Sequence, residues 1–105
     1  MKLGKGKHMR FRDRIADILQ DQKKRHKADP SQAEGLTPIQ ILDRLFDQGN
    51  TRNIPPVRTM GKALLKTAGV YSIGRIRTGT VTMRYQNVYT IDHDVYMQWR
   101  NTHVN

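Results

Sequence analysis

The residues whose types and spacing best suit a chemical task form a stripe of cations. Arg58, Lys62 and Lys66 follow one another at intervals of four residues, so a helix would carry them on one side. Between residues 48 and 91 the chain holds seven Lys or Arg and no Asp or Glu. Positive charge concentrated in this way, without counter-charge, is typical of a surface that binds the phosphates of nucleic acid.

Double-stranded DNA fits this stripe, because a helix about 10–12 Å across matches a major groove about 12 Å wide. Arg58, near the start of the helix, would be placed for bidentate contact with a guanine edge. Arginines further along would hold the backbone or reach a minor groove. The candidate DNA-binding residues are Arg52, Asn53, Arg58, Thr59, Lys62, Lys66, Arg75, Arg77 and Arg84. The competing interpretation is an ordinary solvated helix face.

Other chemistries find little support. There is no cysteine, and the four histidines show no metal-ligand spacing. The run Asp92-His93-Asp94 is interpreted as a solvated strand end rather than a metal or acid-base site. Ser31 and Ser72 lack the surroundings of a nucleophile elbow, and no glycine-rich phosphate loop follows a predicted strand. We therefore expect no enzyme activity, no catalytic residue, no metal and no cofactor.

Three helices must position the cations. Apolar residues at helical spacing from Phe11 to Leu19 predict a first helix from Arg10 that stops at Asp29-Pro30. Thr37, Pro38 and Gln40 predict a capped second helix ending at Gly49, with Ile41, Leu42, Leu45 and Phe46 as its apolar stripe. Pro56 opens a third helix, which Gly69 closes.

From Val70 the hydrophobic period changes to two, which predicts strands. Tyr71 and Ile73 fall on the first strand, and Thr78-Gly79 suits the hairpin turn. The second strand is expected at residues 81–85 and extends to Ile91 past a bulge near Gln86-Asn87. The segment that follows is expected to be a short helix or an extended tail that packs back through Trp99.

The bulk numbers favour one α+β domain. The chain has 105 residues and a formal net charge of +10, which suits one modest core and a polyanionic partner. We expect a flexible basic tail at residues 1–9, where His8-Met9 is typical of a cloning junction, then a domain at 10–99 and a tail at 100–105. No apolar run approaches the roughly 18 residues of a membrane span, so a cytoplasmic protein without membrane contact is expected.

Aromatic residues admit two interpretations. Tyr71, Tyr85 and Tyr89 would stack on unpaired bases if they lie on a basic sheet surface, but alternating strand positions favour the core. Phe11 and Phe46 lie on apolar helical faces and are expected in the core. The first helix, at residues 11–19, is a candidate homodimer contact and equally suits packing on its own domain.

Residues 37–91 resemble a winged helix-turn-helix domain, with a capped helix, a short turn, a basic helix and an Arg-rich hairpin wing. Within them residues 60–70, then Arg75, Arg77 and residues 85–91, are similar to the C-terminal winged-helix module of phage and plasmid primase-helicases. The resemblance implies binding to replication-origin or other DNA, in replication or transcription control of a phage or mobile element. Primase and ATPase segments are absent from this chain, and a fold does not settle a function.

The sequence therefore predicts a small non-enzymatic protein that binds double-stranded DNA. A protein partner in a replication or transcription complex is a further possibility. Two alternatives stay open. One is a module for single-stranded DNA or RNA that uses the tyrosines of the hairpin. The other is a phage protein-interaction or inhibitor module that engages an acidic partner.

Overall fold

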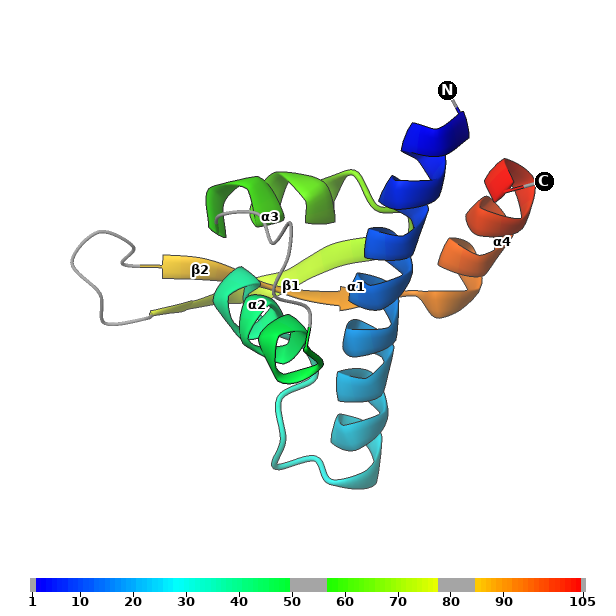
Figure 1. The fold of residues 1–105 in the computed structure, drawn as a ribbon. Helices are drawn as coiled ribbons and strands as arrows, with labels where there is room; N and C mark the ends of the chain where they lie inside the picture. Colours follow the sequence, from blue (N-terminus) through cyan, green and yellow to red (C-terminus); the bar gives the residue numbers. More distant parts are fainter. Residues whose placement is uncertain (1, 50–56, 78–84, 105) are drawn as a thin grey trace.

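The computed structural model describes residues 2–49, 57–77 and 85–104, with side chains at 11–49, 59–77 and 85–102. Its elements are, in chain order, α1 (Lys2–Ala28), α2 (Pro38–Asp47), α3 (Val57–Leu65), β1 (Val70–Arg77), β2 (Tyr85–Ile91) and α4 (His93–Val104). The fold is α+β, as expected. The three-helix count was wrong, because a fourth helix follows the hairpin in the part of the chain that the structure describes (Figure 1).

Helix α1 is the longest element and crosses one end of the sheet (Figure 1). It begins at Lys2 rather than near Arg10, since no proline interrupts the segment and a helix nucleated further along can extend backwards. The expected flexibility of residues 1–9 stays a prediction. The helix ends at Ala28, just before Asp29-Pro30, as predicted. Ile15, Ile18 and Leu19 are buried, and Phe11 packs at the margin of the core.

Helix α2 begins as its sequence predicts. The Thr37 hydroxyl accepts from the Gln40 backbone N–H at 3.3 Å, and the Gln40 side-chain oxygen accepts from the Thr37 N–H at 3.0 Å. This reciprocal capping box satisfies two backbone donors that the helix itself leaves unpaired. Phe46 was expected in the core but is 52% exposed. It lies four residues past buried Leu42 and so only about 40° from it around the helix, so its exposure depends on which neighbours cover the end of α2 rather than on the helical period.

Helix α3 ends at Leu65, and the turn that follows it contains a left-handed glycine, Gly69, which meets the start of α4. Gly69 has φ +82°, and a β-carbon there would lie 2.5 Å from the Asp92 carbonyl oxygen. The Asp92 N–H also donates to the Gly69 carbonyl at 2.8 Å. Glycine is the residue that tolerates both this φ and this close approach. The third helix was predicted to end at Gly69 but ends at Leu65, because the backbone N–H of Thr67 donates to the Leu64 carbonyl, only three residues back. Gly69 instead closes the turn between α3 and β1 and packs against the start of α4.

The two strands form an antiparallel sheet, with Val70 opposite Ile91 and Arg77 opposite Tyr85. Leu36, between α1 and α2, adds an isolated bridge to β2, since Leu36 and Tyr89 exchange two backbone hydrogen bonds of 2.9 and 2.8 Å. The bulge expected near Gln86-Asn87 was misplaced, because the register shift lies on β1 between Ser72 and Gly74. Gly74 allows it, having φ +155°. The predicted turn at Thr78-Gly79 lies outside the described residues.

Opposite residues of an antiparallel pair point to the same face, and faces alternate along a strand. We call the face with Val70, Tyr89 and Ile91 the core-side face, because Tyr89 and Ile91 belong to the hydrophobic core and Val70 packs against it. The other we call the opposite face; it carries Tyr71 and Ile76 on β1 and the buried polar residues Gln86 and Thr90 on β2.

Helix α4 starts where a solvated strand end was expected. Asp92 caps it, since its carboxylate accepts from the Val95 N–H at 3.3 Å and its carbonyl accepts from the Tyr96 N–H at 3.1 Å. The helix then packs along α1, with Tyr96 buried and Trp99 at the margin of the core. Of the two expectations for this segment, the helix is confirmed, and it runs on beyond Trp99 through Arg100.

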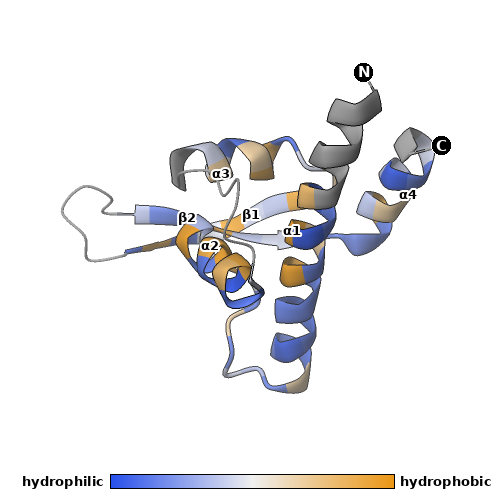
Figure 2. Ribbon diagram, viewed as in Figure 1, coloured by the Kyte–Doolittle hydropathy of each residue, from blue (hydrophilic) through white to orange (hydrophobic). Residues whose placement is uncertain are grey.

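The core lies where the helices meet the sheet. Apolar residues concentrate in α2 and the middle of α1, whereas the C-terminal half of α1 is hydrophilic (Figure 2). Lys23, in that polar half, donates to the Ile91 carbonyl at 3.0 Å and so joins α1 to β2. The buried hydrophobic residues are Ile15, Ala16, Ile18, Leu19, Leu36, Ile41, Leu42, Leu45, Met60, Leu64, Tyr89, Ile91 and Tyr96.

Candidate nucleic-acid interface

The outward side of α3 carries cations. Met60 and Leu64 are fully buried, and this apolar pair fixes which way the helix faces. Thr59 and Lys62, together with Lys66 directly after the helix, are exposed. At about 100° per residue, Lys62 lies directly away from the buried pair, and the other two lie within about 60° of that direction. The structure thus brings together three of the predicted site residues on one accessible surface. Leu65, beside them, is 69% exposed.

The hairpin adds two arginines next to this helix, since α3 packs against β1 (Figure 1). Arg75 and Arg77 are both exposed. The Arg75 guanidinium carbon lies 5.9 Å from the centre of the Tyr85 ring, within the range of a cation–π contact. Both predicted arginines are therefore accessible, and one of them is partnered by an aromatic ring rather than an acid.

The bulge decides where these arginines point. Arg75 and Arg77 pair with Asn87 and Tyr85, which places all four residues on the core-side face. Without the extra residue in β1, the period of two would have put both arginines on the opposite face with Tyr71. A single inserted residue therefore places the cations of the hairpin on the same face of the sheet as Tyr89 and Ile91.

For four of the nine candidate residues, either the whole residue or its side chain falls outside the part of the chain that the structure describes. Arg52, Asn53 and Arg84 fall outside the described residues. Arg58 belongs to the first turn of α3, but its side chain falls outside them too. Their roles stay predictions.

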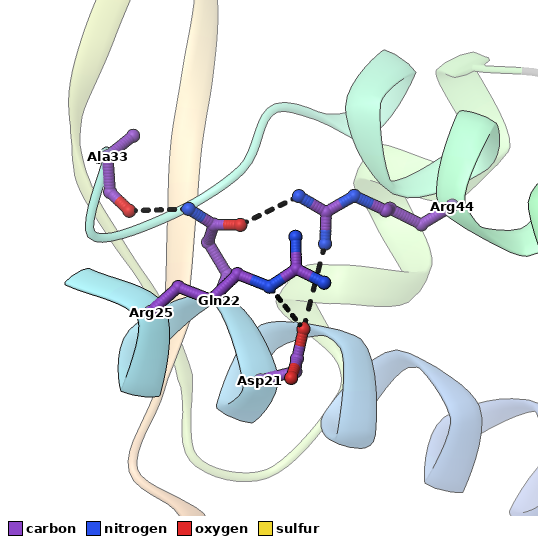
Figure 3. Close-up of polar contacts among 5 residues, drawn as sticks. All are labelled: Asp21, Gln22, Arg25, Ala33 and Arg44. Carbon is purple, nitrogen blue, oxygen red and sulfur yellow. Dashed lines mark hydrogen bonds and ion pairs between the residues drawn. The ribbon is translucent and has the colours of Figure 1, made fainter. Parts of the chain in front are cut away.

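The acidic residues serve other parts of the molecule. Asp21 on α1 forms ion pairs with Arg25 at 2.9 Å and with Arg44 of α2 at 3.9 Å (Figure 3). Gln22 extends this contact, because its side chain accepts from Arg44 at 2.8 Å and donates to the Ala33 carbonyl at 2.7 Å (Figure 3). These bonds hold α1, the linker and α2 together, and Asp21 lies in a hollow of about 500 Å³ between the two helices.

A second acidic contact joins α1 to α4. Asp13 accepts from the Tyr96 hydroxyl at 2.6 Å and from Arg100 at 2.8 and 3.0 Å. Burial raises the pKa of the Asp13 carboxyl, but the hydrogen bonds from Arg100 and Tyr96 together outweigh it and leave that pKa below its ordinary value. Burial, and then the bond to Asp13, raise the pKa of Tyr96.

The described residues of the candidate interface form no ion pair. Among the residues that the structure describes, those on α1, α2 and α4 make every ion pair, and Lys62, Lys66, Arg75 and Arg77 make none. Cations that are solvated and unneutralised are available to an external anion. The segregation that the sequence predicted is confirmed for these four residues.

The tyrosines of the hairpin do not form one surface. Tyr89 is 3% exposed and belongs to the core, as favoured from the alternation. Tyr71 and Tyr85 are 46% and 58% exposed, so the core interpretation was wrong for both. They also lie on different faces of the sheet, because Tyr71 pairs with Thr90 and Tyr85 with Arg77. A stacking surface made of all three tyrosines is thus excluded by the register.

Asn87 was missed as a candidate. It is exposed beside Arg75 on the core-side face, and its side-chain amide donates to the Tyr89 hydroxyl at 3.3 Å. The strand alternation would have grouped it with Tyr85 and Tyr89, had the bulge not been expected at this position.

Other site classes gain nothing from the geometry. In the described part of the chain, no group of three or more potential metal ligands lies close together. The Ser31 hydroxyl donates a hydrogen bond to the Asp29 carboxylate at 2.7 Å, within the linker between α1 and α2. No described helix combines the length and the apolar character that crossing a bilayer would require. Comparisons with models of known families, with curated proteins and with solved structures find no match to this chain.

Proposed function

We propose that this chain is a winged helix-turn-helix protein that binds double-stranded DNA and has no catalytic activity of its own. Helix α3 enters the major groove, and the β1–β2 hairpin is the wing that grips the adjoining backbone. The protein acts in the cytoplasm, in replication or transcription control of a phage or mobile element, by occupying a site or recruiting machinery.

The order of the elements supports the winged-helix assignment. Helices α1, α2 and α3 precede the hairpin, and Leu36 bridges to β2 from the segment between the first two helices. Helix α4 is an addition to that plan, attached through Tyr96 and Arg100 to Asp13 of α1. It leaves the exposed side of α3 uncovered.

The observation that carries the proposal is the accessible, unneutralised charge on two adjacent elements. Lys62 on α3, Lys66 directly after it, and Arg75 and Arg77 on β1 face solvent, and none of them has an ion-pair partner among the described residues. Holding like charges together without counter-charge is unfavourable unless an anion binds there. A regular polyanion of the width of a duplex contacts a helix and a neighbouring hairpin at once, which a small anion does not.

Fluorescence anisotropy tests the proposal. A labelled duplex is titrated with the full-length protein at salt concentrations from 50 to 200 mM. With six to ten phosphate contacts, we expect affinity to fall by roughly 10³- to 10⁵-fold across this range. Absence of binding to the duplex would refute the proposal, and absence of binding to single strands as well would favour a protein partner instead.

A further inference from the structure

The distal half of the hairpin carries a surface whose chemistry differs from that of α3. We define the hairpin patch as Arg75, Arg77, Tyr85 and Asn87, the exposed residues of the core-side face beyond the core. We propose that the hairpin patch binds unpaired bases of single-stranded DNA next to the duplex held by α3. The inference rests on the proposed function for the duplex, and it adds a preference for DNA with a single-stranded tail.

The geometry of the hairpin patch suits a base. Tyr85 lies directly opposite Arg77, and the Arg75 guanidinium carbon lies 5.9 Å from the centre of its ring. Aromatic rings and guanidinium planes are the groups on which unpaired bases stack, without regard to sequence. Tyr85, with 58% of its surface accessible, presents its ring to solvent. The ring is therefore available for a base without rearrangement of the fold.

Asn87 provides a polar group beside this ring. Its side-chain amide nitrogen donates to the hydroxyl of Tyr89, whose ring is held in the core. This bond leaves the Asn87 side-chain oxygen to accept from the edge of a base stacked on Tyr85. A core residue thus orients a surface residue, which favours a preformed contact over an adaptable one.

Charge in the hairpin patch suits the strand that carries the base. Arg75 and Arg77 make no ion pair among the described residues, so both can hold phosphates that follow an unpaired base. Bases inside a duplex are already stacked on each other, and a ring at the surface of a hairpin reaches them only by prying them apart. Ring and cations together therefore favour a strand that is already unpaired.

The opposite face of the same hairpin offers a built-in comparison. Tyr71 lies there with Ile76, and both are nearly half exposed. Along β1 and β2 that face has no Lys or Arg among its described residues. Tyr71 thus matches Tyr85 in residue type, strand pairing and exposure, but lacks the cations that a strand of phosphates needs.

The test compares three labelled DNA probes by fluorescence anisotropy: a blunt duplex, the same duplex with a single-stranded tail of about ten nucleotides, and the tail alone. We expect the unmodified protein to bind the tailed duplex more tightly than the blunt one. Tyr85→Leu should lower the affinity for the tailed duplex by a factor of about 5 to 150, the range typical of the loss of one stacked base. Tyr85→Phe should keep it, because the phenylalanine ring still stacks.

Tyr71→Leu is the matched control and should leave all three affinities unchanged. Arg75→Gln is a second variant of the hairpin patch. It should weaken binding to the probe that consists of the single-stranded tail without a duplex. Thermal melting of each variant checks that the fold is intact. The proposal is overturned if Tyr85→Leu and Arg75→Gln both leave tail binding unchanged, or if Tyr71→Leu weakens it as much as Tyr85→Leu does.

The same probes separate this inference from the duplex proposal. If the blunt duplex does not bind but the tail does, and Tyr85→Leu abolishes that binding, the duplex proposal fails, and only the binding of unpaired bases by the hairpin patch is retained. If an RNA tail binds more tightly than the DNA tail of the same sequence, the assignment to DNA is overturned.

Discussion

The hydroxyl of Tyr96 donates to the carboxylate of Asp13 across 2.6 Å, between residues 83 positions apart in the chain. Arg100, one turn further along α4, donates two hydrogen bonds to the same carboxylate. The three side chains fasten the last helix to the first. Because the contact combines a buried ring with a charged acceptor, it predicts a pH dependence of stability.

Asp13→Asn should lower the free energy of unfolding by about 1–2 kcal/mol at pH 7, the worth of hydrogen bonds to a partly exposed charged group. The pKa of Asp13 is lower in the folded protein than its ordinary value. This stabilisation is therefore complete above the ordinary carboxyl pKa and is lost as the pH falls through the folded pKa. Urea unfolding at pH 7 and at pH 3 measures the difference.

The difference in free energy of unfolding between the unmodified protein and Asp13→Asn should become smaller as the pH drops below about 4. Asp43→Asn is the control, because Asp43 is exposed on α2, and surface changes of this kind stay within about 0.5 kcal/mol. A difference that is the same at both pH values would show that the charge of Asp13 contributes nothing to the attachment of α4.

Two left-handed glycines, one in the turn after α2 and one in the turn after α3, test how these turns are built. Gly49 and Gly69 have φ of +81° and +82°, but a β-carbon on Gly49 would meet nothing within 4 Å. On Gly69 it would lie 2.5 Å from the Asp92 carbonyl oxygen and 3.1 Å from the Tyr96 nitrogen. Gly49→Ala should cost about 1–2 kcal/mol for the left-handed backbone alone.

Gly69→Ala should cost roughly 1–3 kcal/mol more than Gly49→Ala, because the backbone atoms of α4 must also shift. Chemical denaturation of both variants gives the difference. Equal losses would mean that the start of α4 moves away without penalty, and the contact between Gly69 and α4 would then be no constraint on the fold.

Local signals predicted the elements well, and contacts between elements less well. The capping box at Thr37 and the glycine that ends α2, Gly49, were predictable because each depends on a few neighbouring residues. The end of α3 was predicted four residues too late, at Gly69. The bulge at Ser72–Gly74 was not predictable from neighbouring residues. Its position depends on how β1 pairs with β2, and the tyrosines and asparagine of β2 offered an equally good place for it.

The candidate site shows the same division. The sequence placed the cations on α3 and the hairpin, since charge and helical spacing are local properties. It could not place Tyr71 and Tyr85 on different faces, because a shift of one residue in register exchanges the two faces. The prediction that Phe46 lies in the core was wrong for a related reason, since the exposure of this residue depends on which neighbours cover the end of α2.

Arg58, in the first turn of α3, is predicted to read a base. If it does, Arg58→Ala should cost about 1–3 kcal/mol of binding to the preferred duplex and relax specificity at one position. Selection of bound duplexes from a random pool, followed by anisotropy on the enriched sequence and on a scrambled one, provides the measurement. An equal loss for both sequences would assign Arg58 to the phosphates instead.

Lys62 and Lys66 are expected to contact phosphates from the exposed side of α3. Replacing both by alanine should weaken duplex binding for every sequence and make the logarithm of affinity less steep against the logarithm of salt, by about one unit per lost contact. The matched control is Lys24→Ala with Lys27→Ala, which removes two exposed lysines from the C-terminal end of α1. Both double variants carry the same net charge, so any effect of total charge alone is common to them.

Comparing the salt dependence of affinity of the two double variants therefore separates the effect of where the lysines lie from the effect of total net charge. A loss of slope confined to the α3 variant would locate the duplex on that helix. If both variants lose slope equally, the duplex is attracted by the net charge of the whole chain, and docking through α3 is wrong. Because screening acts on both variants alike at each salt concentration, the slopes are compared within one titration series and need no absolute affinity.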